Sequence, residues 1–467
     1  MESEAKLSKE SSQSSGAGPL SVEELGAKVD SGEIDTVVVA FPDMQGRLQG
    51  KRIHGDFFME EVLNHGTEGC NYLLAVDVEM NTVPGYAMSS WDTGYGDFVM
   101  KIDTSTLRNM PWAPGSALVI ADLYTLKDEP VAPAPRNILK QQVARLAERN
   151  MVALAGTELE FIVFNDTFEE AFTKSYRNLT PSNLYNVDYS LLGGYRVEPL
   201  LREIRLAMAQ SGMRVESVKG ECNFGQHEIA FKYDEVVKTC DNHSIYKHGS
   251  KDIAAKQGMS LTFMAKYNER EGNSCHIHLS VRGTDGALVM VDDTKPEGLS
   301  ELGRSFIAGQ IAHMNELTLL FAPNINSYKR YVEGSFAPTA ITWGRDNRTC
   351  AFRLVGHGQS LRSENRVPGG DVNPYLAIAG MIAAGLDGVD KKMTLGPRFD
   401  GNAYISSEPR VTDNLTSALE LWRGSSWARE VFGAEVHDHY ANMALVEIKA
   451  HKRAVTEWEL IRNFERF

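Results

Sequence analysis

Charged residues at positions i and i+2 recur inside segments that are otherwise apolar, and this pattern limits the folds open to the chain. Alternate residues of a β-strand point to the same face, so each pair would place two charged side chains on one side of a sheet. Buried charges are costly unless opposite charges or hydrogen bonds compensate them. The pattern therefore predicts strands whose charged faces need bound cations. The pairs are Glu158 and Glu160, His276 and His278, and Glu364 and Arg366.

Two further carboxylates, Glu221 and Glu228, lie in the segment GECNFGQHE. Each motif is weak alone, because Glu-x-Glu is usually a solvated strand face and His-x-His is usually a core or surface pair. Together the glutamates and one imidazole form an oxygen-rich donor set, which suits Mg²⁺ or Mn²⁺ better than Zn²⁺. The candidate metal ligands are Glu158, Glu160, Glu221, Glu228, His276 and Glu364.

A second group of charges consists of arginines downstream of the histidine pair. A solvated basic patch is the alternative interpretation of such a group. Here the arginines are interleaved with Trp343, Phe352 and small residues, which favours partial burial and anion binding, because guanidinium groups match carboxylate and phosphate oxygens bidentately. The residues are Arg330, Arg345, Arg348 and Arg353.

Composition excludes several classes of function. The chain has 48 Lys and Arg against 62 Asp and Glu, a net charge of −14, which argues against nucleic acid or an anionic membrane as a partner. Five dispersed cysteines without a CxxC pair indicate reduced thiols and a cytoplasmic protein. No apolar run approaches the roughly 18 to 20 residues of a membrane span. The sequence contains no GxxxxGK[ST], strand-associated GxGxxG or HExxH motif.

The chain divides into a tail and two α+β regions. Residues 1–19 are polar and predict a disordered tail, and residues 20–128 predict a small domain. A proline-containing linker then leads to a larger α/β domain over residues 136–467. In the small domain we expect a helix capped by Ser21 and Glu24 and four strand-like segments. These segments are 35–41, 72–76, 98–102 and 117–122.

The larger region alternates between predicted strands and helices. A strand is expected at 152–164. Helices are expected at 137–149, 199–210, 302–320 and 375–386. The last of them is apolar on nearly every face and therefore buried, and Asn373 is its predicted N-cap, followed by a proline at the first helical position.

The order of the motifs resembles the type I glutamine synthetase family from about residue 20 to residue 467. That resemblance implies a small N-terminal β-grasp domain, a large catalytic α/β domain and subunits that form two hexameric rings, a dodecamer with active sites between neighbours. The matching segments are ELEF at 158–161, GQHE at 225–228, LTFM at 261–264, HIH at 276–278, NSYKR at 326–330, NRT at 347–349, ENR at 364–366 and NPYL at 373–376.

The resemblance also implies roles for individual residues. It assigns Glu160, Glu221 and Glu228 to one metal and Glu158, His276 and Glu364 to a second, so two or more ions per site. Gly272, Arg330 and Arg366 match glutamate-binding positions. Arg348 and Arg353 would face the ATP phosphates, with Arg366 also near the reacting groups, and His278 and Ser280 would lie on the ATP side. The implied reaction activates glutamate as γ-glutamyl phosphate, which an amine then attacks.

The departures from the family pattern fall on the amine side. Phe336 stands where the family's flap has an ammonium-handling glutamate, and the family's Asp-Gly-Ser-Ser sequence is absent. Asp77 is a possible substrate-binding equivalent, and Asp97 matches a second, catalytic aspartate. We therefore expect a γ-glutamyl–amine ligase, with an alkyl polyamine slightly favoured over ethanolamine. The alternatives are a true glutamine synthetase that uses ammonium and a non-catalytic structural relative.

Overall fold

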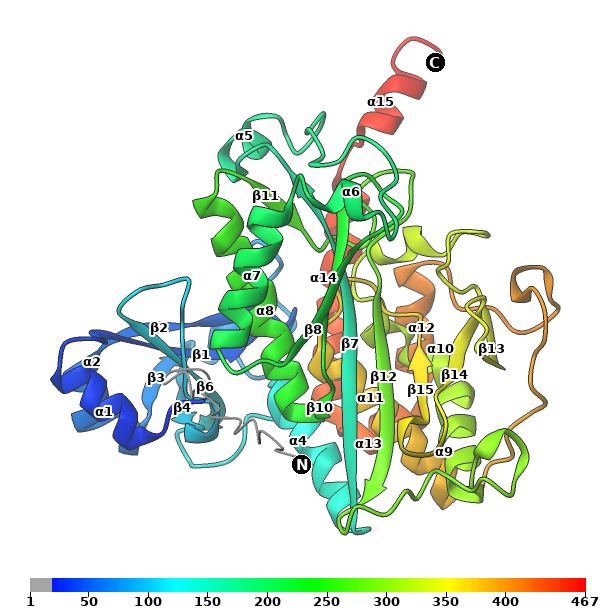
Figure 1. Cartoon of the computed structure of the whole chain (residues 1–467), viewed down its shortest axis with the longest axis horizontal. Helices are drawn as coiled ribbons and strands as arrows, with labels where there is room; N and C mark the ends of the chain where they lie inside the picture. The colour runs from blue at the N-terminus through cyan, green and yellow to red at the C-terminus, as the bar shows by residue number, and fades with distance from the viewer. Residues whose placement is uncertain (1–18) are drawn as a thin grey trace, which may run out of the picture.

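The computed structural model describes residues 19–467 and contains two β-sheets covered by helices (Figure 1). The predicted tail at 1–19 lies outside the described residues except for Pro19, which forms an isolated bridge with Arg108. The first sheet has the strand order β2-β1-β6-β4-β3, with β5 beside β6. Its strands are β1 Thr36–Pro42, β2 Leu48–His54, β3 Thr67–Cys70, β4 Asp97–Ile102, β5 Arg108–Asn109 and β6 Ser116–Thr125.

Most of the small-domain predictions are confirmed. Helix α1 (Val22–Asp30) begins with the predicted capping box between Ser21 and Glu24. The strand predicted at 72–76 is wrong, because Asn71–Leu74 forms a 3-10 helix closed by a hydrogen bond from Ala75 N to Tyr72 O. This turn follows directly on the edge strand β3, where the chain leaves the sheet. Two short helices, α2 Gly55–Phe57 and α3 Leu63–His65, lie earlier in this region.

The second sheet has the order β13-β14-β15-β12-β7-β9-β8, and β10 and β11 also pair with β7. The 14-residue strand β7 confirms the strand predicted at 152–164. All pairs are antiparallel except β13 with β14. The strands are β7 Met151–Phe164, β8 Val215–Gly220, β9 Gln226–Phe231, β10 Asp234–Glu235, β11 Ser260–Thr262, β12 Cys275–Gly283, β13 Ala340–Arg345, β14 Cys350–Val355 and β15 Arg362–Asn365.

Helices pack around this sheet, and α11 is the most buried of them. The predicted N-cap Asn373 accepts a hydrogen bond from Tyr375 N. Helix α9 crosses α11 closely, since a Cβ at Gly309 would lie 2.1 Å from the carbonyl oxygen of Ala384. The helices are α4 Pro135–Ala147, α5 Phe168–Thr173, α6 Leu191–Gly194, α7 Glu198–Gln210, α8 Val236–Lys256, α9 Glu301–Ala312, α10 Met314–Phe321, α11 Pro374–Asp390, α12 Leu415–Gly424, α13 Ser426–Phe432, α14 Ala434–Arg453 and α15 Glu457–Asn463.

The single helix predicted at 302–320 is wrong, because the chain bends at His313 between α9 and α10. The His313 ring stacks on Trp427 at 3.6 Å between centroids. Its Nδ1 lies 2.8 Å from Glu316 and its Nε2 lies 2.8 Å from Asp387. The contacts with Asp387 and Trp427 are tertiary, and they hold His313 at φ −97° and ψ 8°, outside helical geometry. The periodicity of the sequence does not indicate such contacts.

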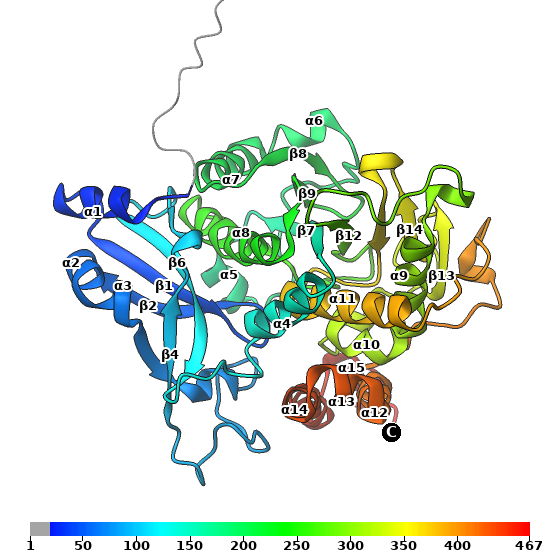
Figure 2. The same cartoon turned by 90° about the horizontal axis from the view of Figure 1, so that it is seen from below.

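Helix α4 joins the two sheets (Figure 2), because it contacts β6 of the first sheet and β7 of the second. Arg136, in its first turn, is 3% exposed and forms ion pairs with Asp103, Asp122 and Asp241. At the far end of the chain, α15 extends away from the body (Figure 1). Of the helices in the described region, 19–467, none has the length and apolarity needed to cross a membrane. The α+β class predicted from the sequence is confirmed.

Candidate active site

A cavity of about 1010 Å³ is lined by residues of β7, β8, β9, β12 and β14 of the nine-stranded sheet, and most of the predicted site residues line it. Strand register explains their convergence, because residues directly opposite on neighbouring antiparallel strands share a face. Lys219, Glu228 and Glu160 lie opposite one another across β8, β9 and β7. The predicted residues that line the cavity are Glu158, Glu160, Glu221, Glu228, Gly272, His276, Arg330, Phe336, Arg348, Arg353 and Arg366.

Three glutamates form the first cluster. Ligand oxygens of Glu160, Glu221 and Glu228 all lie within 4.8 Å of one another. Burial, reinforced by the charge of Glu160, raises the pKa of Glu221 to about 7. Burial also raises the pKa of Glu228 well above its ordinary value, and the nearby charge of Glu158 adds to the effect. An all-oxygen set with this much unfavourable charge fits a hard divalent cation such as Mg²⁺ or Mn²⁺.

Hydrogen bonds fix the orientation of this cluster. Glu160 accepts hydrogen bonds from the backbone N–H of Ser274 (2.8 Å) and from Nε2 of Gln226 (3.0 Å). Gln226 also donates to the carbonyl oxygen of Gly272 at 3.0 Å. The carboxylate is therefore held in place independently of any ion.

The second cluster contains Glu158, His276 and Glu364, whose ligand atoms also lie within 4.8 Å of one another. Burial alone would raise the pKa of Glu158, but hydrogen bonds from His276 and His278 outweigh it and lower the pKa. Burial, together with the charge of Arg366, lowers the pKa of His276 and favours the neutral imidazole that binds metals. The pairing of two carboxylates with one imidazole fits a second divalent cation of the same class.

The arginines surround the second cluster. Glu364 is 0% exposed and ion-pairs with both Arg353 and Arg366. Arg330 is buried and donates from Nη1 to the carbonyl oxygen of Val367 at 2.9 Å. Gly272 is required beside it, because a Cβ there would lie 2.7 Å from Cγ of Arg330.

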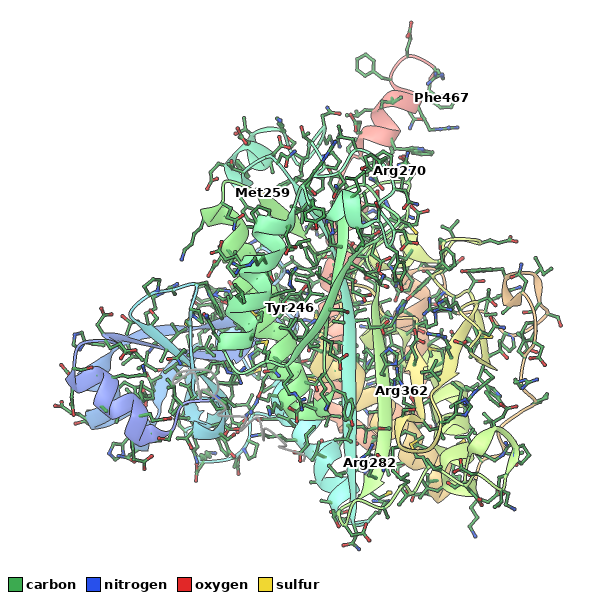
Figure 3. The ribbon with its side chains drawn as sticks, viewed as in Figure 1. Tyr246, Met259, Arg270, Arg282, Arg362 and Phe467 are labelled. Carbon is green, nitrogen blue, oxygen red and sulfur yellow. The ribbon has the colours of Figure 1, made fainter. Side chains whose placement is uncertain are left out.

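Other predicted residues lie around this site or apart from it. The structure does not bring Arg345 to the cavity, because its guanidinium contacts His357 and the carbonyl oxygen of Gly356. His278 lies behind Glu158, and Arg362, labelled in Figure 3, donates from Nε to Nδ1 of His278 at 3.1 Å. Ser280 lies two residues further along β12 and is partly buried.

The two aspartates of the small N-terminal region do not line this cavity within one chain. Asp77 lines a separate small pocket with Tyr86 and Glu447. Asp97 is the exposed first residue of β4. The single chain therefore does not bring these two predicted residues to the cavity.

Sequence analysis missed one wall of the cavity. Lys219 ion-pairs with Glu221, and the spacing of these two residues is the same i, i+2 that identified the other pairs. Tyr189, Leu191 and Tyr195, from α6 and the residues on either side of it, also line the cavity. These three side chains are largely exposed, so they do not belong to the periodic pattern of buried residues by which sequence analysis identifies an element.

The chain is similar to known proteins in both sequence and structure. The family described as "Glutamine synthetase, catalytic domain" matches residues 132–463. The chain is 61% identical over 448 residues to a gamma-glutamylethanolamide synthetase of Streptomyces coelicolor, with 96% of each chain covered. It is 36% identical to a glutamate–isopropylamine ligase of a Pseudomonas species, covering 94% of this chain and 96% of the relative. A solved GmaS–ADP complex superimposes with a TM-score of 0.83 at 27% identity, covering 94% of this chain and 99% of that one.

Proposed function

The chain belongs to the glutamine synthetase family, and within that family we propose that its amine substrate is ethanolamine or a primary amine of similar size. The chain is a carbon–nitrogen ligase that joins the γ-carboxylate of glutamate to an amine. The observation that carries the proposal is Phe336, which lines the cavity where the resemblance places an ammonium-handling glutamate. A phenyl ring accepts no proton from ammonium but packs against an alkyl chain.

The sequence alone slightly favoured a polyamine as the amine substrate, and similarity to two relatives favours ethanolamine instead. The relative that is 61% identical is named for an ethanolamide product, and the one that is 36% identical is named for isopropylamine, a small alkylamine. Ethanolamine needs a partner for its hydroxyl group, and the sequence named none clearly. Tyr189, Tyr195 and Ser335 line the cavity and supply hydroxyl groups that could accept or donate this hydrogen bond.

The charged residues support the activation of glutamate by ATP. Divalent cations held by the two clusters would neutralise negative charge on the transferring phosphoryl group. Arg330, Arg366 and Gly272 would bind glutamate, whose carboxylates suit guanidinium forks. The ATP side comprises Arg348, Arg353, His278 and Ser280. The buried ion pairs of Arg353 and Arg366 with Glu364 preorganise both groups, which is how electrostatic catalysis avoids reorganisation.

We also propose that the protein assembles with itself, as two hexameric rings. In this assembly Asp97 and Asp77 would complete the site of a neighbouring chain. A second support is α15 with its flanking residues, whose apolar side chains are exposed in the single chain and fit burial against another copy. These side chains are Val455, Trp458, Leu460, Ile461, Phe464 and Phe467. Deletion of 455–467 should produce a smaller particle in analytical ultracentrifugation, and an unchanged size would contradict this role of α15.

An amine panel with phosphate release and product mass tests the proposed substrate. Ethanolamine should give the highest kcat/KM among ethanolamine, isopropylamine, putrescine, spermidine and ammonium. Highest activity with ammonium would instead identify a true glutamine synthetase. Absence of phosphate release with every amine would favour a non-catalytic relative.

A further inference from the structure

Lys219 is a cation built into the three-glutamate cluster. It lies near the end of β8, directly opposite Glu228 on β9, so its side chain shares the face of that carboxylate. Its ammonium group ion-pairs with Glu221 and lies 4.9 Å from the centre of the Tyr189 ring. The side chain is only 23% exposed, so solvent screens these interactions weakly.

This ammonium group and a divalent cation need the same carboxylate oxygens. Glu221 takes part both in the ion pair with Lys219 and in the set of three glutamates whose oxygens lie within 4.8 Å. Two cations at one carboxylate repel each other, and the repulsion is strong where water is partly excluded. An ion that binds Glu160, Glu221 and Glu228 must therefore either displace Lys219 from Glu221 or bind less tightly because the ammonium group repels it.

The surroundings of Lys219 allow this displacement without burying an unpaired charge. A carboxylate oxygen of Asp188 lies within 4.8 Å of one of Glu221, on the exposed side of the cluster. The Tyr189 ring offers a cation–π surface beside it. Lysine carries its charge on a flexible four-carbon stem, so the ammonium group can move between these partners.

We propose that Lys219 competes with the divalent cation for Glu221 and thereby weakens metal binding at the three-glutamate cluster. The inference rests on the proposed function only in taking this cluster as a metal site. Lys219 is accordingly a positioning residue that holds Glu221 and sets the affinity of the cluster. It takes no part in bond making.

Titration of the full-length protein with Mn²⁺, with free Mn²⁺ followed by electron paramagnetic resonance, tests the proposal. Lys219→Met should bind Mn²⁺ about tenfold more tightly than the wild type, because it keeps the length of the stem and loses the charge. Lys219→Arg keeps the charge and should resemble the wild type. Lys232→Met removes a charge from a lysine that lies over Tyr233, outside the cavity, and should also resemble the wild type.

Thermal unfolding provides a second measurement that does not depend on activity. In chelator, Lys219→Met should have a lower Tm than the wild type. Added Mn²⁺ should raise the Tm of this variant by more than it raises the Tm of the wild type. Lys219→Gln gives the same comparison with a polar side chain, should the apolar variant fail to fold. Unchanged or weaker Mn²⁺ binding by the charge-removing variants would overturn the proposal. Absence of Mn²⁺ binding by the wild type would overturn both this inference and the metal site of the proposed function.

Discussion

Nη2 of Arg366 lies 3.4 Å from the carbonyl oxygen of Phe336 and donates a hydrogen bond to it. The same guanidinium ion-pairs with Glu364, so one side chain links the backbone at Phe336 to the second carboxylate cluster. Phe336 has a φ of +60°, in the left-handed region, and the residue is 57% exposed. The hydrogen bond from Arg366 thus fixes the backbone at Phe336, and this backbone sets the direction of the side chain at position 336.

Phe336→Glu should shift preference toward ammonium. The new carboxylate would leave the same backbone position and supply a proton acceptor, a form of help worth about 10² to 10⁴ in rate. We expect the ratio of kcat/KM for ammonium to that for ethanolamine to rise at least ~10-fold. Putrescine and spermidine complete the panel. Phe336→Leu, which stays apolar, is the matched control and should not raise this ratio. An equal rise in both variants would mean that space rather than the carboxylate is responsible.

Glu160→Gln should abolish ATP-dependent phosphate release while leaving the fold intact. The amide keeps the shape of the side chain but removes one charge from the three-glutamate cluster. Loss of metal-assisted charge stabilisation costs several kcal/mol, so activity should fall by about 10³ or more. Glu216→Gln removes a carboxylate from the same cavity outside both clusters and serves as a comparison. Turnover by the wild type in excess chelator would exclude the role proposed for the metals.

The raised pKa of Glu221, about 7, predicts a pH-dependent penalty at the cluster. Unfolding releases this carboxyl to ionise near its ordinary pKa, so its contribution to the free energy of unfolding falls as pH rises from about 4.5 to 7. Glu221→Gln mimics the protonated form and should remove the penalty. In chelator, its Tm should exceed that of the wild type by about 2 to 4 °C near pH 8. The difference should nearly vanish near pH 5. Equal differences at both pH values would contradict this assignment.

Local periodicity and capping predicted much of the fold. The box at Ser21 and the cap at Asn373 depend only on neighbours in the sequence, and both are confirmed. The bend at His313 was missed because it depends on Asp387 and Trp427, which approach His313 only in the folded chain. Local pattern cannot report such contacts.

The same distinction applies to the site. The i, i+2 spacing identified residues on shared strand faces, and the register of β7, β9 and β12 brings them together. Lys219 has this spacing with Glu221 but was missed, because a lysine and a glutamate at i and i+2 are also typical of a strand face that is exposed to solvent. The aromatic wall at Tyr189 and Tyr195 was missed because it comes from a short helix and its loop, which carry no strand alternation.

Arg136 should be among the most important residues for stability outside the site. It is buried between the two sheets and pairs with Asp103 and Asp122 from the first region and Asp241 from α8. Arg136→Met would leave three carboxylates without their shared buried cation, and breaking a buried pair costs about 3 to 5 kcal/mol.

Lys140 provides a matched comparison, because it contacts Asp103 and Asp122 from the same helix but is 37% exposed. Exposed pairs are worth about 0 to 1 kcal/mol, so Lys140→Met should change the free energy of unfolding much less. Urea unfolding of both variants, followed by circular dichroism, measures the difference. Comparable losses in the two variants would show that solvent reaches Arg136 and that the charges at this junction are not buried as the structure has them.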